Sequence, residues 1–180
     1  MKVAHFGDTH IRNLKYHKEY RKVFSEIYES LRGLEVDVIV HAGDLGHTKT
    51  QISPEFVQMC SDFLKNLADI APLVIIPGNH DGNLKNSSRE DSITPIVSAL
   101  GHPHIHYFKN SGEFHLNDDV CFNALSMFDE KSWASPTDKK KINIAVYHGT
   151  IIGCMTDAEW TLEHGDNDMS IFEGFDYGML

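Results

Sequence analysis

The first half of the chain alternates between short apolar runs and segments that carry apolar residues at helical spacing. The runs at residues 1–6, 36–40 and 73–76 are nearly continuous, as expected of strands buried on both faces of a sheet. Between them, residues 20–31 and 54–67 repeat apolar side chains three and four positions apart, the period of an amphipathic helix. This order of strand, helix, strand, helix and strand predicts an α/β domain.

The second half of the chain has a different pattern: its apolar segments are short, follow one another closely and indicate strands. A polar loop and a short helix at residues 94–100 lead into it. We expect strands at residues 105–108, 113–116, 120–126, 142–147 and 175–180. Together they look like the second half of a layered sandwich. At 180 residues, the whole chain (1–180) is predicted to form one domain.

The composition is that of a folded protein without a membrane segment. The chain has no low-complexity tract and no repeat of fixed period, and 41% of its residues are hydrophobic. Its apolar runs are too short to span a bilayer, and the N-terminus has the pattern of a strand rather than of a signal segment. We therefore expect an intracellular, cytoplasmic protein with no membrane partner.

The charge balance limits how the chain can hold nucleic acid. A net charge of −10 argues against binding through the overall electrostatic field, because contacts to phosphate groups need local lysine and arginine side chains. Some of the carboxylates are candidate metal ligands, however, and bound divalent ions would reverse the sign of the field where they sit.

Residue types that bind metals follow four of the apolar runs directly. The carboxyl ends of parallel strands share one edge of a sheet, so these side chains are expected to converge there. Taken singly, Asp8 reads as a turn residue or helix cap and His148 as a strand-end histidine; the coincidence of four such positions favours a site. A mixed oxygen and nitrogen shell suits Mn, Fe, Zn or Mg ions, and a carboxylate such as Asp44 can bridge two ions about 3.5–4 Å apart. The positions are Asp8 and His10, then Asp44, then Asn79 and His80, and finally His148.

These positions lie in segments that resemble the successive motifs of calcineurin-like metallophosphoesterases. The segments are FGDTH, AGDL, PGNHD and YHG, in that order over nearly the whole chain. The resemblance implies a layered α/β/β/α sandwich and two divalent metal ions, Mn²⁺ in the first place with Mg²⁺ as the alternative. It also implies the residue roles: Asp8 and His10 bind the first ion, Asp44 bridges, Asn79 and His148 bind the second, and His80 is the catalytic histidine near the scissile phosphate.

The second motif selects a branch of this family. Its sequence, Asp44-Leu45-Gly46-His47, is similar to the Asp-Leu-x-His pattern of the SbcD-like repair nucleases, whereas protein phosphatases carry Gly-Asp-x-x-Asp-Arg-Gly. The likeness implies that His47 helps to place a DNA phosphodiester. It further implies exonuclease or endonuclease activity at DNA ends in recombination and repair, with an SMC-like ATPase as partner.

The end of the chain departs from the family pattern. A last histidine motif that completes the metal shells normally follows a strand like residues 176–180, and this sequence stops at Leu180. His164 precedes that strand and is a poor substitute. We therefore expect a nuclease domain that is incomplete at its C-terminal end, without the capping and ATPase-binding regions and with weakened metal binding.

Two other functions and one mode of assembly stay open. The same ligands would serve a small-molecule or cyclic-nucleotide phosphodiesterase, and the missing motif is compatible with a non-catalytic dimeric scaffold. A homodimer through the helices at 54–67 and 94–100 is suggested because the first helix carries more apolar positions than one buried stripe needs. The alternative is that all of these side chains pack inside the monomer.

Overall fold

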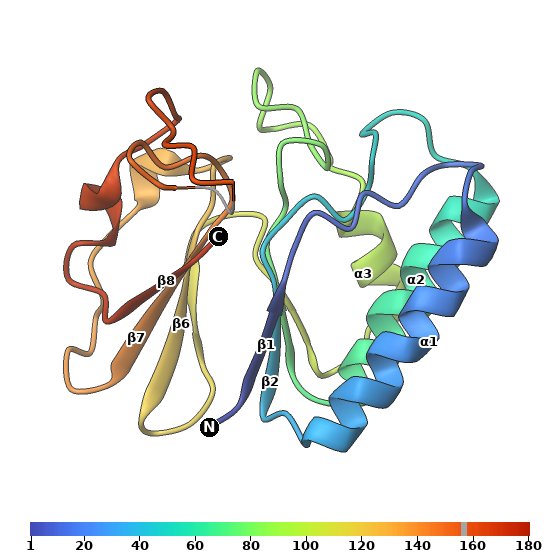
Figure 1. The fold of residues 1–180 in the computed structure, drawn as a ribbon, viewed down its shortest axis with the longest axis horizontal. Helices are drawn as coiled ribbons and strands as arrows, with labels where there is room; N and C mark the ends of the chain where they lie inside the picture. The colour runs from blue at the N-terminus through green and yellow to red at the C-terminus, as the bar shows by residue number, and fades with distance from the viewer. Residues whose placement is uncertain (156–157) are drawn as a thin grey trace.

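The computed structural model describes residues 1–155 and 158–180 and shows two four-stranded sheets packed face to face (Figure 1). In the first sheet all neighbouring strands are parallel and follow chain order: β1 (Val3–Phe6), β2 (Val38–His41), β3 (Leu73–Ile75) and β4 (Ile105–Tyr107). In the second sheet β5 is antiparallel to β6 and the other pairs are parallel: β5 (Gly112–His115), β6 (Val120–Leu125), β7 (Ile142–Tyr147) and β8 (Tyr177–Met179).

Three α-helices cover the outer face of the first sheet: α1 (His17–Leu34), α2 (Pro54–Ala68) and α3 (Thr94–Leu100) (Figure 1). Helix α2 begins as its sequence predicts, with Pro54 in the first turn and the Ser53 hydroxyl accepting a hydrogen bond from the amide of Phe56 at 3.2 Å. Helix α1 begins at His17, three residues before the predicted start at Tyr20. The sequence pattern did not indicate this earlier start because the first turn of the helix is polar and carries no apolar periodicity. Phe24 of α1 stacks on Phe63 of α2 with ring centroids 4.1 Å apart.

The side chains of the first sheet alternate between two cores. On β2, Ile39 faces the helices, while Val38 and Val40 face the second sheet. Phe122 of β6 and Val146 of β7 meet them from the other side, and all of these side chains are buried. This double burial explains why the strands of the first sheet read as continuous apolar runs.

The outer face of the second sheet is covered by loops and two short 3₁₀ turns. These turns are η1 (Glu130–Ser132) and η2 (Met169–Phe172), and within the described residues no α-helix lies on this side. Tyr147 is buried here with Trp133 against its ring edge and Phe172 nearby. The predicted layered α/β arrangement is confirmed, and the fourth layer consists of irregular chain. Across the described part of the chain, no helix has the length and apolar character that crossing a bilayer requires.

The apolar surplus of α2 that suggested a dimer is taken up within the monomer. All six positions are at most 3% exposed, because the sheet, α1 and α3 surround the helix: Phe56, Met59, Cys60, Phe63, Leu64 and Leu67. The interpretation that these side chains pack internally is therefore the correct one for this helix.

The helical core generates a stability prediction. Phe63→Ala is expected to lower the free energy of unfolding by about 3–5 kcal/mol, because it removes a buried ring and leaves a cavity beside Phe24. Val23→Ala on α1, where the side chain is 49% exposed, is the control and should change it by no more than about 0.5 kcal/mol. Urea denaturation in the presence of a chelator measures both. Equal stability of the two variants would contradict the placement of this core.

Candidate metal centre

The candidate residues lie on loops that leave β1, β2, β3 and β7 at one edge of the two sheets. The first two loops continue to pair after their strands end: the amide of Asp8 donates to the Gly43 carbonyl at 3.0 Å and that of His10 to the Asp44 carbonyl at 3.0 Å. The amide of Ile11 donates to the Leu45 carbonyl at 2.9 Å. These bonds lock the first motif to the second.

Three residues of these loops have left-handed backbone conformations although none is a glycine. The φ angles are 50° for Asp8, 46° for His10 and 54° for Asp44. Such a conformation costs roughly 1–3 kcal/mol for each residue and persists where the surrounding structure holds it, most often at functional sites. Three of the six non-glycine residues with positive φ in the described part of the chain are thus predicted metal ligands.

Asp44 lies at the centre of the cluster, and its two carboxylate oxygens face different groups. Its Oδ2 is 3.5 Å from Nε2 of His10, and its Oδ1 is 3.5 Å from Nε2 of His148. Oδ1 also accepts a hydrogen bond from the amide of His80 at 2.8 Å. Burial opposes ionisation of Asp44, but the hydrogen bonds from His148 and His80 lower its pKa on balance. A buried, ionised carboxylate directed to both sides has the geometry of a bridging ligand.

One side of Asp44 is formed by the first motif. Asp8 Oδ1 is 3.3 Å from Nε2 of His10, and the Asp8 side chain is 69% exposed. Asp8, Asp44 and His148 also form a group whose ligand atoms all lie within 4.8 Å of one another. The Asp8 carboxylate is therefore open to an ion or a substrate that approaches from solvent.

The other side of Asp44 is formed by His148 and Asn79. His148 Nδ1 donates to the Ala42 carbonyl at 2.8 Å, so Nε2 is the atom that faces the Asn79 Oδ1, 3.1 Å away, and Asp44. Burial lowers the pKa of His148, but the hydrogen bond and charge of Asp44 raise it overall. Lone pairs of nitrogen and oxygen converge here and need a proton or a cation between them. This donor set fits a divalent metal ion.

Two glycines are required by this close packing. A Cβ atom on Gly78 would lie 2.1 Å from Asp44 Oδ1, and one on Gly43 would lie 2.5 Å from Nδ1 of His148. Gly43 also has φ of 102°, which favours glycine. The glycines that precede Asp44 and Asn79 in their motifs thus make room for the ligand side chains.

His80 and His47 lie beside the cluster, in a group with His10. His80 Nδ1 donates to the His47 carbonyl at 2.7 Å, which leaves Nε2 of His80 available to a substrate. The rings of His47 and His80 stack with centroids 5.7 Å apart, and His10 meets His80 edge-on at 4.8 Å. Desolvation and the charge of Arg12 lower the pKa of His47, so this imidazole is neutral at pH 7.

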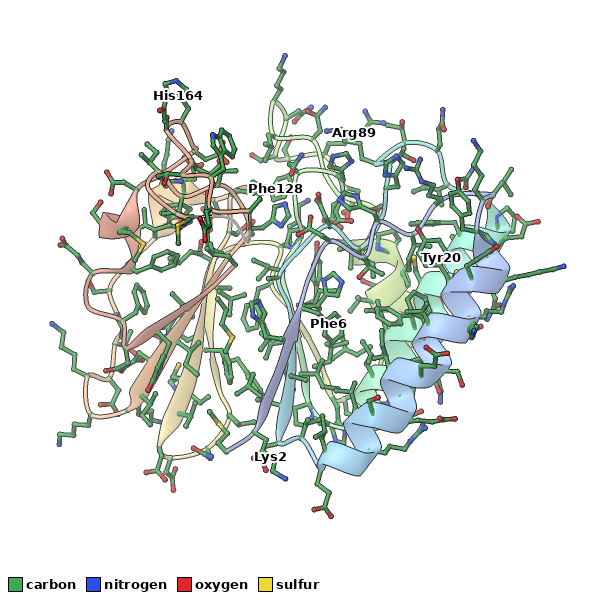
Figure 2. All side chains as sticks on the ribbon, in the orientation of Figure 1. Lys2, Phe6, Tyr20, Arg89, Phe128 and His164 are labelled. Atoms are coloured by element: carbon green, nitrogen blue, oxygen red, sulfur yellow. The ribbon has the colours of Figure 1, made fainter. Side chains whose placement is uncertain are left out.

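The structure brings together all seven residues that the sequence indicated as ligands or catalytic groups: Asp8, His10, Asp44, His47, Asn79, His80 and His148. His164 does not join them. It is exposed on a loop above the second sheet, as Figure 2 shows. The expectation that His164 is a poor substitute for a missing ligand agrees with this position.

Asp81 has no role predicted from the sequence, although its side chain holds the second and third motifs together. Its carboxylate accepts hydrogen bonds from the amides of Gly46 at 2.8 Å, Gly78 at 2.9 Å and Leu45 at 3.2 Å. Burial raises its pKa to about 7, against the effect of these three donors. The only signal was its place directly after Gly-Asn-His, and burial cannot be read from that.

A further group of metal-binding residue types lies away from this edge, on the outer face of the second sheet. Glu113, His115 and Cys121 are close to one another there. The amide and hydroxyl of Thr137 already donate to the two oxygens of Glu113, and the Lys141 ammonium is 3.4 Å from His115 Nδ1. The group is a network of polar contacts, because a cation would face the lysine charge.

Comparison with known proteins relates this geometry to a family. The chain is 34% identical to uncharacterized protein R555 of Acanthamoeba polyphaga mimivirus, over 99% of this chain and 14% of that protein. It is 32% identical to the DNA double-strand break repair protein Mre11 of Saccharolobus solfataricus, over 45% of this chain and 23% of that protein. With Mre11 of Methanopyrus kandleri the identity is 25%, over 91% of this chain and 41% of that protein.

The chain thus spans less than half the length of each of these relatives. The family model for calcineurin-like phosphoesterases matches residues 1–174, a range that includes every residue of the metal centre described above. The chain belongs to the calcineurin-like phosphoesterase family.

Proposed function

We propose that this chain is the catalytic domain of a metal-dependent DNA nuclease of the SbcD and Mre11 kind, which hydrolyses phosphodiester bonds at DNA ends in recombination and repair. The observation that carries the proposal is the placement of Asp44, whose two oxygens face separate sets of nitrogen and oxygen donors. A phosphoesterase that uses two metal ions needs such a bridging carboxylate.

The residues divide into two subsites around Asp44. Asp8 and His10 would hold one ion with Oδ2 of Asp44, and Asn79 and His148 would hold the other with Oδ1. The mixture of carboxylate, amide and imidazole ligands suits Mn²⁺, with Mg²⁺ as the alternative. Bound ions would supply positive charge that activates a water molecule for attack and neutralises the phosphate oxygens.

The histidines beside the ligands would act on the substrate. The hydrogen bond from His80 Nδ1 to the His47 carbonyl fixes the ring, so Nε2 faces the leaving oxygen and, when the ring is protonated, can donate its proton to it. The neutral imidazole of His47 stacks against His80 and would orient the phosphodiester for in-line attack. Both residues thus act by position rather than as metal ligands.

Four observations support DNA as the substrate. The Asp44-Leu45-Gly46-His47 motif is similar to that of the repair nucleases, and the relatives named Mre11 are described as DNA double-strand break repair proteins. The centre is open to solvent at Asp8. A cation lies at its rim, where Lys49 Nζ donates to the Asn79 carbonyl at 3.2 Å, and local cations can hold phosphates despite the negative net charge. The proposal includes an intracellular site of action and an SMC-like ATPase as partner.

The division of roles predicts different phenotypes for two substitutions. His80→Ala should lower phosphodiester cleavage at least about 100-fold while changing Mn²⁺ affinity little, because His80 acts on the leaving group. Asp44→Asn should lose both activity and metal, since it removes charge from the bridging position. Calorimetry with Mn²⁺ and a cleavage assay measure the two effects, with His102→Ala, a histidine outside the cluster, as the control. Equal metal loss in both variants would contradict these roles.

The choice of substrate is tested by offering several phosphodiesters to the Mn²⁺-loaded protein. We expect cleavage of DNA ends and hairpins, with lower efficiency on a small chromogenic diester and on cyclic nucleotides. Activity on the small diester or the cyclic nucleotides without activity on DNA would identify a small-molecule phosphodiesterase instead. Failure to bind metal at all would favour a non-catalytic scaffold.

A homodimer through the helices at 54–67 and 94–100 would have to use their outer surface, because the inner side of α2 is fully packed. Val57 is the exposed apolar residue of α2, at 37%. In a symmetric interface the surface around Val57 would contact the same surface of the second copy. Light scattering should then show a dimer that Val57→Glu converts to a monomer, while Val23→Glu on α1 leaves it intact. A monomeric wild-type chain at micromolar concentration would end this proposal.

A further inference from the structure

A buried histidine that belongs to neither metal subsite contacts the loop that carries Asp8 and His10. His41 is the last residue of β2, and its side chain is 0% exposed on the helical side of the sheet. The rings of Phe6 and Phe63 lie against it with centroids 5.3 Å and 6.4 Å away. Its Nε2 shares a hydrogen bond of 2.6 Å with the hydroxyl of Thr9.

Thr9 lies between two strained ligands. Asp8 and His10 on either side have φ of 50° and 46°, and their amides bond to the carbonyls of the second motif. The Thr9 side chain points to the helical side, where the hydrogen bond to His41 holds it. On the same side the Tyr20 hydroxyl donates to the His10 carbonyl at 2.7 Å. The loop is therefore tied to the body of the fold by hydrogen bonds.

Packing leaves space beside this loop. An open pocket of about 340 Å³ lies next to it, and its lining includes Phe6, Thr9, Tyr20, Phe24 and Phe63. A loop next to such a space can move into it when a hydrogen bond is lost. The backbone strain at Asp8 and His10 favours that movement.

The buried position of His41 is unfavourable for the stability of the core. Nδ1 of His41 is buried and finds no hydrogen-bond partner among the described residues. A buried polar atom without a partner costs stability, so it needs an explanation outside packing. Burial lowers the pKa of His41 to about 3, so the ring offers Thr9 a hydrogen bond without adding positive charge near a cation site.

We propose that His41 is a positioning residue that acts through Thr9 to hold Asp8 and His10 in the geometry that binds the first metal ion. This inference rests on the proposed two-metal function. Replacing His41 by an apolar residue should therefore weaken metal binding without weakening the fold. If His41 had only a structural role, the same replacement would not be expected to weaken metal binding in this way.

The test uses two substitutions of similar shape, Thr9→Val and His41→Leu, alone and combined. Each should lower Mn²⁺ affinity about tenfold, as is typical when a residue that supports a ligand is lost. The double variant should bind no more weakly than the single ones, because both remove the same bond. Thr9→Ser and His41→Gln keep a hydrogen-bonding group and should restore most of the affinity. The urea midpoint of metal-free His41→Leu should equal or exceed that of the wild type.

A second readout needs no metal. In the chelated protein, amide exchange at Asp8 and His10 should become about fivefold faster in Thr9→Val and His41→Leu. Val40→Ala is the matched control, since Val40 is fully buried on the same strand but faces the second sheet. It should lower stability and leave both the affinity and these exchange rates unchanged.

The outcomes separate this inference from the proposed function. Failure of the wild type to bind Mn²⁺ would overturn the proposed function and, with it, the part of this inference that concerns metal binding. The amide exchange rates would still report whether the hydrogen bond between Thr9 and His41 holds the loop that carries Asp8 and His10. Unchanged affinity and exchange in the single variants would overturn the inference alone. So would additive losses in the double variant, or a loss of stability in His41→Leu that matches its loss of affinity.

Discussion

The site depends on one buried carboxylate, that of Asp44, held between two sets of donors. Its side chain is 3% exposed, and a buried charge is tolerated only when partners surround it. His10 and His148 face its two oxygens, and the amide of His80 bonds to one of them. Since these partners come from three other loops, the position of Asp44 determines how the loops meet.

The fold meets this requirement through the parallel arrangement of its strands. Strands β1, β2 and β3 end at the same edge of one sheet, and β7 of the second sheet ends beside them. Backbone strain at the ligands is balanced by backbone bonds between the first two loops and by the Asp81 carboxylate between the second and third. The protein therefore maintains an arrangement that no single loop would adopt alone.

The electrostatic character of the chain is uneven, and this matters for its substrate. Its net charge is −10, yet the region that faces the proposed substrate contains His47, His80 and the ammonium of Lys49. Acidic side chains gather where cations would bind, and cationic or hydrogen-bonding groups stand around them. A phosphodiester would thus be attracted by the loaded centre rather than by the surface as a whole.

The sequence by itself determined the succession of strands and helices along the chain, the α/β class and the candidate ligands. It could do so because apolar periodicity and residue type are local properties. It predicted that Asp8, Asp44, Asn79 and His148 converge, since parallel strands end at one edge. Only the tertiary structure decided which way side chains face: that α2 packs all its apolar residues internally, and that Asp81 and His41 are buried against the loops. Burial and hydrogen-bond partners depend on segments far apart in the chain, and no local pattern carries that information.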